Sequence, residues 1–375
     1  MIYFDHAATA MNRPASVLKA FEECLVNTPA SPGRGSYRPA ADAGRFLYEC
    51  RCRIGSYFGL SEPDLVVFTK NSTEAVNLYL RGKLRAGDHV ILSPYEHNCV
   101  FRTLYDMKLH DGITYTVIKR EDLELSPKEL LSKYCTDQTV LLCMMYRSNL
   151  TGRRILRKEY CTAAHERGLL VFCDASQGAG YHTIQMQEEG IDVLAFTGHK
   201  DLRGLPGVGG VCFLAEPKIK PLLQGGTGVF GYEPLNPKCF PDGLEAGTVN
   251  LPAIAALAEA VRVCEENASD NLKNLLLLQT HLHEKLKNVC GITIYDAECD
   301  HLGITAFNMR EFFSDEVVEC LDRAGICVRG GIHCTALAHE AIGTLEHGAV
   351  RIALSPSNTF EEIDALYECL KDMVH

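Results

Sequence analysis

The sequence lacks the features that mark membrane, nucleic-acid-binding and disordered proteins. No run of about 18 consecutive apolar residues occurs, so we expect no membrane-spanning helix and no membrane partner. Positive charge is scarce: 37 Lys and Arg residues against 48 Asp and Glu residues give a net charge of −11, which argues against binding to nucleic acid. The 46% hydrophobic and 23% charged content is ordinary for a globular chain and supports a sizeable core.

Targeting signals and nucleotide-binding motifs are missing as well. The first residues, MIYFDHAATAMNRP, carry Asp5 and His6 where a signal peptide requires a basic and then an apolar region. We therefore expect a cytoplasmic protein. No Walker-type GK(S/T) occurs, and no G-x-G-x-x-G follows a predicted strand, which argues against a nucleotide-binding α/β protein.

Cysteine is abundant, but its spacing defines neither a metal site nor a disulfide framework. Most of the 17 cysteines lie in apolar runs, as Cys143 does in VLLCMMY and Cys173 in LLVFCDA. No CxxC pair and no paired zinc-ligand spacing is present. We interpret most of them as reduced structural thiols and predict no metal.

Short β-rich runs alternate with amphipathic helical patterns up to about residue 215. Apolar strand runs separated by helices are typical of a mostly parallel sheet that is covered on both faces. We therefore predict an open α/β sheet of about seven strands that binds ligands at the carboxyl ends of the strands. The predicted strands are 65–69, 89–93, 113–118, 140–146, 169–174, 193–197 and 208–213, and the predicted helices are 74–84, 98–109, 127–134 and 157–167.

The pattern changes near residue 250 and predicts a smaller α+β domain. We assign residues 1–250 to the large domain, with the option that about the first 14 pack on the small domain, and residues 251–375 to the small domain. Residues 225–247, rich in Gly and Pro, are predicted to form an ordered loop. The elements expected after residue 250 are one long or broken helix over 251–288, strands near 292–296, 303–309 and 349–354, a helix at 315–324 and a terminal helix from 360.

Two charged residues stand at the ends of predicted buried strands. Lys200 ends FTGHK and precedes a glycine-rich turn; burial would lower its pKa and provide the neutral amine that forms a Schiff base. A surface lysine beside a hairpin turn explains the same residues. Asp174 ends LLVFCD and suits pairing with a pyridinium nitrogen, which keeps pyridoxal phosphate (PLP) protonated as an electron sink. A helix N-cap is the alternative for Asp174.

Two further strand ends carry polar residues. Ser72 and Thr73 stand where a helix begins, so free backbone N–H groups and two hydroxyls could hold a phosphate; a capping box explains them equally well. His97 follows another strand and could lie over a bound ring, although an isolated histidine is more often a surface or core residue. Because these strand ends meet on one face of the sheet, together they predict a PLP site.

The order of these motifs resembles that of the class V aminotransferase-fold PLP enzymes (fold type I), and among them the SUF-type (group II) cysteine desulfurases. The similarity runs nearly from end to end of the chain. Each motif alone is weak or moderate, whereas their order and spacing are specific. The segments that carry the resemblance are YFDHAAT (3–9), RGSY (34–37), STEAVN (72–77), EHN (96–98), SNLTG (148–152), DASQ (174–177), TGHK (197–200), EAGTVN (245–250), VRGGIHC (328–334) and RIALS (351–355).

The resemblance implies a cofactor role for each matching residue. Lys200 would bind PLP covalently and move a proton, Asp174 would pair with the pyridinium nitrogen, and His97 would stack on the ring and could act in proton transfer. Residues near the phenolic oxygen would be Gln177 and Asn149. Residues that bind the phosphate would be Ser72, Thr73, Thr197 and His199, with Thr248 reaching it from the neighbouring subunit of a homodimer.

The resemblance also implies how substrate is held and which group takes the sulfur. Arg351 would grip the α-carboxylate bidentately, with Arg329 and Asn149 lining the same site. Cys334 would be the nucleophile that takes the sulfur as a persulfide. The implied enzyme converts L-cysteine to L-alanine and serves sulfur metabolism such as iron–sulfur cluster assembly through a sulfur-acceptor protein.

Three alternatives remain open at the level of sequence. A selenocysteine lyase uses the same fold and cofactor and could tolerate loss of Cys334. Another class V aminotransferase or β-lyase would not need Cys334 either. A non-catalytic sulfur-transfer scaffold is a remote alternative, because a scaffold has no need for an electron sink built from Lys200 and Asp174.

Overall fold

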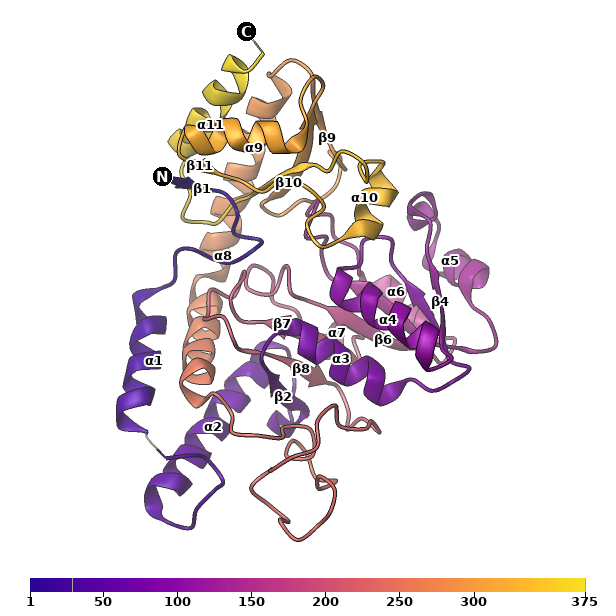
Figure 1. Cartoon of the computed structure of the whole chain (residues 1–375), viewed down its shortest axis with the longest axis vertical. Helices are drawn as coiled ribbons and strands as arrows, with labels where there is room; N and C mark the ends of the chain where they lie inside the picture. Colours follow the sequence, from indigo (N-terminus) through magenta and orange to yellow (C-terminus); the bar gives the residue numbers. More distant parts are fainter. Residues whose placement is uncertain (29, 375) are drawn as a thin grey trace.

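The structure is a computed structural model that describes residues 1–28 and 30–374. The larger part of the chain folds around a seven-stranded sheet (Figure 1). The strand order is β2-β8-β7-β6-β5-β3-β4. Neighbouring strands run parallel except at β8, which is antiparallel to β2 and β7. The strands are β2 (Val66–Thr69), β3 (His89–Leu92), β4 (Thr114–Val117), β5 (Thr139–Met145), β6 (Leu170–Asp174), β7 (Val193–Thr197) and β8 (Gly209–Phe213). The predicted mostly parallel α/β sheet is confirmed.

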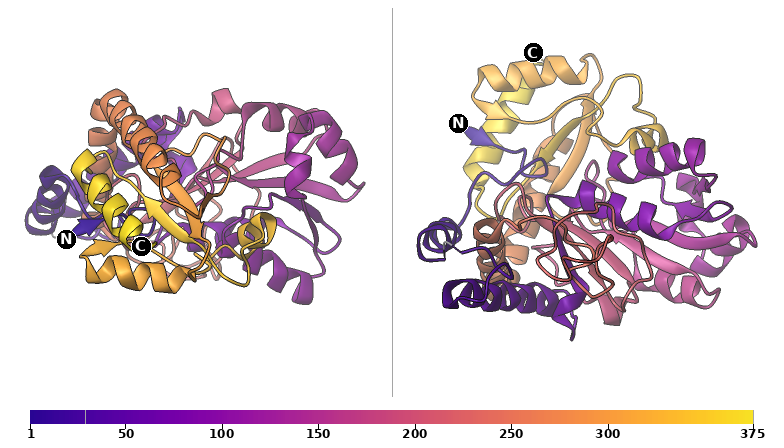
Figure 2. Two further views of the ribbon diagram at one scale, coloured as in Figure 1. Left: turned by 90° about the horizontal axis from the view of Figure 1, so that it is seen from above. Right: turned by 60° about the horizontal axis from the view of Figure 1, so that its bottom comes forward.

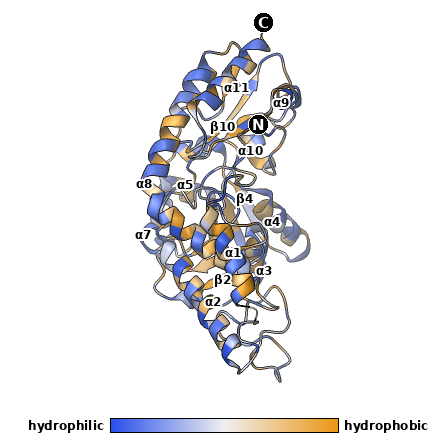
Figure 3. Cartoon of the chain, turned by 90° about the vertical axis from the view of Figure 1, so that its left-hand side faces the viewer, coloured by the Kyte–Doolittle hydropathy of each residue, from blue (hydrophilic) through white to orange (hydrophobic). Residues whose placement is uncertain are grey.

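Alternate residues of the central strands enter two separate cores, which explains their uninterrupted apolar runs. In β5, Leu141 and Cys143 pack into one core, whereas Leu142 and Met144 pack into the other. Because helices cover both faces, neither face of the sheet needs polar residues, and Figure 3 shows apolar strands enclosed by helices with polar outer faces. The helices of this region are α1 (Ala15–Asn27), α2 (Arg38–Tyr57), α3 (Ser72–Lys83), α4 (Asn98–His110), α5 (Pro127–Tyr134), α6 (Lys158–His165) and α7 (Met186–Glu189), with 3₁₀ turns η1 (Pro63–Leu65) and η2 (Arg120–Glu124).

The reversed direction of β8 follows from its short connection to β7. Residues 198–208 link the two strands without a helix, and a parallel pair would need a crossover of about a dozen residues or more. A Cβ atom at Gly210 would lie 2.7 Å from the Phe196 ring, so only glycine fits there without a shift. Strands β7 and β8 are therefore packed closely at the end from which the turn with Lys200 emerges.

A single 37-residue helix, α8 (Leu251–Lys287), connects the two parts of the chain (Figure 1). Its N-terminal half packs on α1 and α2, where Leu251 and Ala255 share a cluster with Cys24 and Ala43. Its C-terminal half carries apolar residues of a third core, which lies in the C-terminal part of the chain: Leu275, Leu278, Leu282 and Leu286. One long helix, rather than a broken pair, therefore occupies residues 251–287. Because this helix packs in both parts of the chain, the domain boundary at residue 250 stays a prediction.

The third core is built on a three-stranded antiparallel sheet of order β12-β10-β9. Its strands are β9 (Ile292–Ile294), β10 (Ile304–Met309) and β12 (Val350–Ala353), and its helices are α9 (Ser314–Arg323), α10 (Ala336–Ile342) and α11 (Phe360–Asp372). The strands near 292–296, 303–309 and 349–354 and the helices near 315–324 and after 360 are thus confirmed. Helix α10 was not predicted.

The N-terminus lies beside these C-terminal elements, as two further views show (Figure 2). Strand β1 (Ile2–Tyr3) pairs in parallel with β11 (Ile326–Cys327), and Phe4 is buried in the third core. Asp5 forms a bridge to Ala353 on β12. Within the described residues, none of the helices combines the length and the hydrophobicity needed to cross a membrane.

Candidate active site

The carboxyl ends of the parallel strands open into a cavity of about 270 Å³ whose walls come from both parts of the chain. The structure places there every predicted catalytic, cofactor-binding and substrate-binding residue except Thr248. The predicted residues that line the cavity are Ser72, Thr73, His97, Asn149, Asp174, Gln177, Thr197, His199, Lys200, Arg329, Cys334 and Arg351.

Asp174 is the last residue of β6, and its buried carboxylate is held from two sides. Its Oδ1 accepts hydrogen bonds from the backbone N–H (2.9 Å) and hydroxyl (2.6 Å) of Ser176 and lies 3.4 Å from the Ser72 hydroxyl. Its Oδ2 accepts from the Cys99 thiol at 3.6 Å. These contacts fix a buried negative charge at the floor of the cavity.

Lys200 lines the same cavity from the turn after β7. Backbone hydrogen bonds from Arg203 N to Lys200 O and from Gly204 N to Gly198 O, both 2.7 Å, close this turn. Burial lowers the pKa of Lys200, and the charge of Asp174 opposes that shift. A partly buried lysine amine with a lowered pKa is suited to nucleophilic or base chemistry.

His97 follows β3 and caps the N-terminus of α4. Its Nδ1 accepts the backbone N–H of Cys99 at 3.1 Å, so the proton of the neutral ring resides on Nε2. Burial, reinforced by the charge of Lys200, lowers the pKa of His97 to about 4. The imidazole is therefore neutral at neutral pH.

Three buried oxygen atoms in the cavity wall have no hydrogen-bond partner among the described residues: Asn149 Oδ1, Gln177 Oε1 and Thr197 Oγ1. The amide nitrogens of the first two are engaged, Asn149 Nδ2 with the His333 carbonyl and Gln177 Nε2 with the Ala7 carbonyl, both at 2.9 Å. A buried polar atom without a partner costs about 1–3 kcal/mol. The cavity is therefore built to receive a polar ligand.

The part of the chain after α8 contributes two arginines and a thiol. Arg351 on β12 is buried; its NH1 donates to the Asn149 carbonyl (2.8 Å) and its NH2 pairs with Asp5 Oδ1 (2.5 Å). The Arg329 guanidinium donates to Cys334 Sγ at 3.7 Å. Cys334 is exposed and stands at the edge of the cavity, so a thiol, two cations and the lysine face one space.

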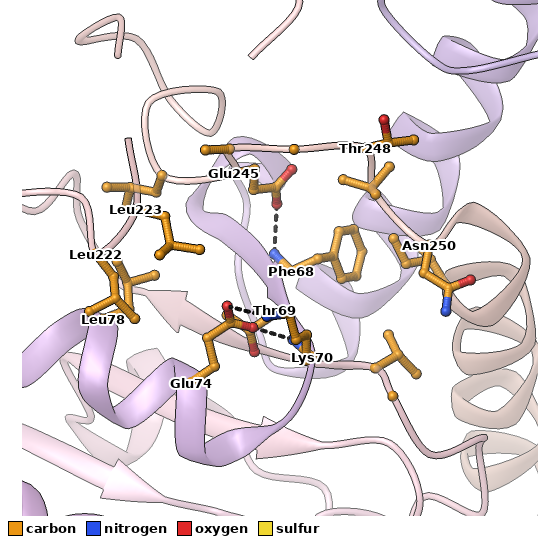
Figure 4. Close-up of a pocket in the computed structure, with 17 residues that line it drawn as sticks. Phe68, Thr69, Lys70, Glu74, Leu78, Leu222, Leu223, Glu245, Thr248 and Asn250 are labelled. Carbon is orange, nitrogen blue, oxygen red and sulfur yellow. Dashed lines mark hydrogen bonds and ion pairs between the residues drawn. The ribbon is translucent and has the colours of Figure 1, made fainter. Parts of the chain in front are cut away.

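Thr248 lies outside this cavity, in a second one of about 420 Å³ with Lys70 and Glu74 (Figure 4). Its loop is held by Glu245, which forms a buried bidentate ion pair with Arg51 (2.7 and 2.8 Å) and accepts the Phe68 N–H at 2.6 Å. A contribution of Thr248 to the site of a neighbouring subunit stays a prediction.

Sequence reasoning missed several residues that shape the cavity. Cys99 and Ser176 hold Asp174, and Asp5 neutralises Arg351. Asp5 is part of the opening motif, and although the first residues were expected to be able to pack on the small domain, no ion pair with Arg351, 346 residues away, was predicted. For Cys99 the only available signal was its position two residues after His97, at the start of a helix.

Comparison with known proteins points to one family. The family described as aminotransferase class-V matches residues 2–366. A probable cysteine desulfurase of Methanothermobacter thermautotrophicus is 30% identical over 387 residues, which cover 99% of this chain and 94% of the relative. A cysteine desulfurase of Escherichia coli is 27% identical and covers 98% of this chain and 91% of the relative.

Solved structures give the same picture. The apo structure of a cysteine desulfurase from Thermococcus onnurineus matches with a TM-score of 0.89 and 26% identity, covering 100% of this chain and 94% of that chain. A crystal structure of an Escherichia coli cysteine desulfurase in its S-sulfonic acid form matches with a TM-score of 0.84 and 25% identity, covering 99% of this chain and 94% of that chain.

Proposed function

The chain belongs to the class-V aminotransferase family, and on that basis we propose that it is a PLP-dependent cysteine desulfurase. It converts L-cysteine to L-alanine and passes the sulfur to Cys334 as a persulfide. One observation carries the proposal: Lys200, Asp174 and Cys334, which come from three separate segments, line one cavity.

The residues of the cavity fit PLP. Lys200 would hold the cofactor covalently, and the fixed Asp174 carboxylate would pair with its pyridinium nitrogen. Phosphate would lie at the N-terminus of α3, where backbone N–H groups favour an anion, within reach of Ser72, Thr73, Thr197 and His199. The unpartnered Thr197 hydroxyl and Asn149 and Gln177 oxygens support a polar occupant. When bound, PLP supplies the electron sink that amino-acid side chains lack.

Proton transfer falls to Lys200 and His97. With its pKa lowered by burial, the Lys200 amine can accept a proton from the α-carbon side of the substrate and return it. The neutral His97 ring offers an Nε2–H donor toward the cavity. With its pKa lowered to about 4, the His97 ring stays neutral across the neutral pH range.

Arg351 and Arg329 provide the charges for the substrate carboxylate. Nε of Arg351 has no partner among the described residues, so one donor of the guanidinium is free although NH2 pairs with Asp5. Arg329 adds a second cation beside Cys334. An amino acid held by these groups would present its sulfur to the mouth of the cavity.

Cys334 is the sulfur acceptor in this proposal. Its thiolate, the nucleophilic form, attacks the substrate sulfur; a new S–S bond replaces the substrate C–S bond, and the carbon gains a proton to become the methyl group of alanine. A thiol reductant or a sulfur-acceptor protein then removes the transferred sulfur. We place this activity in the cytoplasm, within sulfur metabolism.

We also propose that the enzyme is a homodimer. Loop residues between 223 and 235 expose large apolar side chains to solvent, namely Leu223, Val229, Phe230, Tyr232 and Leu235. Leu223 lines the cavity that contains Thr248 (Figure 4), and the other four belong to the same loop, so a second copy that covers this loop would bury both the loop and the cavity. Sedimentation analysis should give a dimer.

The test is alanine release from L-cysteine in the presence of a reductant. We expect a yellow wild-type protein that forms alanine, and a Lys200→Ala variant that forms none. A wild-type protein that takes up no PLP, or that is inactive on L-cysteine when loaded with it, would contradict the proposal.

A further inference from the structure

A chain of three buried side chains lies beneath the loop that carries Cys334. His333, His339 and Thr344 are 2%, 0% and 2% exposed. His333 Nδ1 lies 3.3 Å from His339 Nε2, and His339 Nδ1 lies 2.7 Å from Thr344 Oγ1. The two rings are nearly parallel, 8° apart, with their centres separated by 5.5 Å. We refer to these residues as the histidine relay; it plays no part in the function proposed above.

One backbone carbonyl fixes the direction of every hydrogen bond in the relay. The Arg329 carbonyl lies 3.1 Å from His333 Nε2 and can only accept, so His333 carries its proton on Nε2 and accepts at Nδ1. His339 must then donate from Nε2 and accept the Thr344 hydroxyl at Nδ1. Burial lowers the pKa of His333 to about 2 and that of His339 to about 4, which keeps both rings neutral.

The relay supports a backbone conformation that side-chain-bearing residues seldom adopt. His333 and Cys334 have φ values of 54° and 58°, in the left-handed region that favours glycine. On the large-sheet side, the His333 carbonyl accepts from Asn149 Nδ2 (2.9 Å) and the Cys334 carbonyl from Asn98 N (2.8 Å). The His333 ring provides the opposing anchor on the other side.

The Arg329 backbone, which anchors the His333 ring, is also bonded to the backbone of Arg351. The Arg329 carbonyl that accepts from His333 accepts the Arg351 N–H as well, at 2.7 Å. His339 lies on α10, the helix that begins two residues after Cys334. The relay therefore joins the backbone of Cys334 to the bridge between Arg329 and Arg351.

We propose that His339 is a positioning residue that, through His333, fixes the backbone of Cys334 so that its sulfur faces the cavity. This inference rests on the proposed function in assigning the sulfur transfer to Cys334. Removal of the His339 N–H leaves His333 Nδ1 buried without a donor. The His333 ring is then free to change tautomer, its bond to Arg329 is lost, and the left-handed pair relaxes.

The test compares variants that remove a relay hydrogen bond with variants that keep it. His339→Leu removes the donor to His333, whereas His339→Gln keeps an N–H donor. Thr344→Val removes the hydroxyl at nearly constant volume, whereas Thr344→Ser keeps it. His347→Leu, an exposed histidine of the same region outside the relay, controls for the loss of any imidazole.

Two readouts are measured on the full-length, PLP-loaded protein: kcat and KM for L-cysteine, and amide hydrogen exchange of peptides that cover residues 329–335 and Asn98. For His339→Leu we expect kcat to fall about tenfold, as for one lost buried hydrogen bond, with KM within about twofold. Exchange in both peptides should rise at least about threefold, while β10 and α9 keep their wild-type exchange. Thr344→Val should change both readouts in the same direction. The conservative variants and His347→Leu should stay close to the wild type.

Two results would overturn the proposal. One is a folded His339→Leu protein with wild-type kcat and exchange. The other is a fall in kcat together with raised exchange throughout β10, α9 and α11, which indicates a purely structural role. If His339→Leu does not fold, Thr344→Val is judged by the same criteria. An inactive wild-type protein would refute the proposed function alone, because the exchange measurement still decides whether the relay holds the loop.

Discussion

Replacing Asp5 by asparagine should have opposite effects on the stability of the free protein and on its affinity for an amino acid. Arg351 is buried, and Asp5 is its carboxylate partner, at 2.5 Å. Breaking a fully buried ion pair costs about 3–5 kcal/mol. The Asp5 side chain is 20% exposed and asparagine can still accept a hydrogen bond, so we expect a loss of about 1.5–3 kcal/mol, the range of one hydrogen bond to a charged group.

The affinity of the Asp5→Asn variant for an amino acid should rise. In the wild type, the α-carboxylate of an amino acid must share Arg351 with Asp5 and is repelled by it. Removing that negative charge should lower the Kd of the product L-alanine by about tenfold, which corresponds to about 1.4 kcal/mol. Saturating L-alanine should then recover part of the lost stability in the variant, because it supplies the missing carboxylate.

Urea unfolding followed by circular dichroism, with and without L-alanine, measures both effects on the PLP-loaded protein. Asp270→Asn, at an exposed position, is the matched control and should leave stability and affinity unchanged. An Asp5→Asn protein with wild-type stability, or with weaker L-alanine binding, would refute the competition between Asp5 and substrate for Arg351.

Three further predictions concern buried groups. Burial raises the pKa of Glu96 to about 8, against about 4.3 in the unfolded chain. Between these values the folded state holds a proton that the unfolded state lacks, so the contribution of Glu96 to stability falls as the pH rises through this window. Glu96→Gln should therefore make the stability in urea depend less on pH over the same window. Cys99→Ala removes a donor to Asp174 and should weaken PLP binding by about two- to tenfold in absorbance titrations of the apo protein, whereas Cys99→Ser should retain it. Glu245→Gln leaves Arg51 buried without its ion pair and should destabilise the protein by about 3–5 kcal/mol in urea, a loss that a wild-type denaturation curve would contradict.

The large sheet was predictable because both of its faces are apolar. Strands such as β5 alternate between two cores, so their runs are uninterrupted and end where polar residues begin. The positions of Asp174 at the end of β6 and of Lys200 shortly after β7 followed directly, since the carboxyl ends of parallel strands share one edge. The strand pattern alone therefore predicts that these two residues lie close together at one edge of the sheet.

Helices α1 and α2 were missed although they span 13 and 20 residues, whereas the other missed elements carry little local signal. Strands β1 and β11 have two residues each, too few for periodicity, and exist because they pair with each other. Helix α10 spans seven residues directly after a motif that was interpreted only for its cysteine. The bond between Cys99 and Asp174 and the ion pair between Asp5 and Arg351 depend on tertiary contacts, which spacing along the chain does not encode.

The central claim is that Cys334 receives the sulfur of L-cysteine. It is tested most directly by peptide mass spectrometry of PLP-loaded protein that has been incubated with L-cysteine without reductant and then alkylated. The account predicts a gain of one sulfur atom on the peptide that contains Cys334, its removal by a thiol reductant, and its absence from Lys200→Ala. Alanine formation with no added sulfur on that peptide, or with the sulfur on another cysteine, would contradict the account.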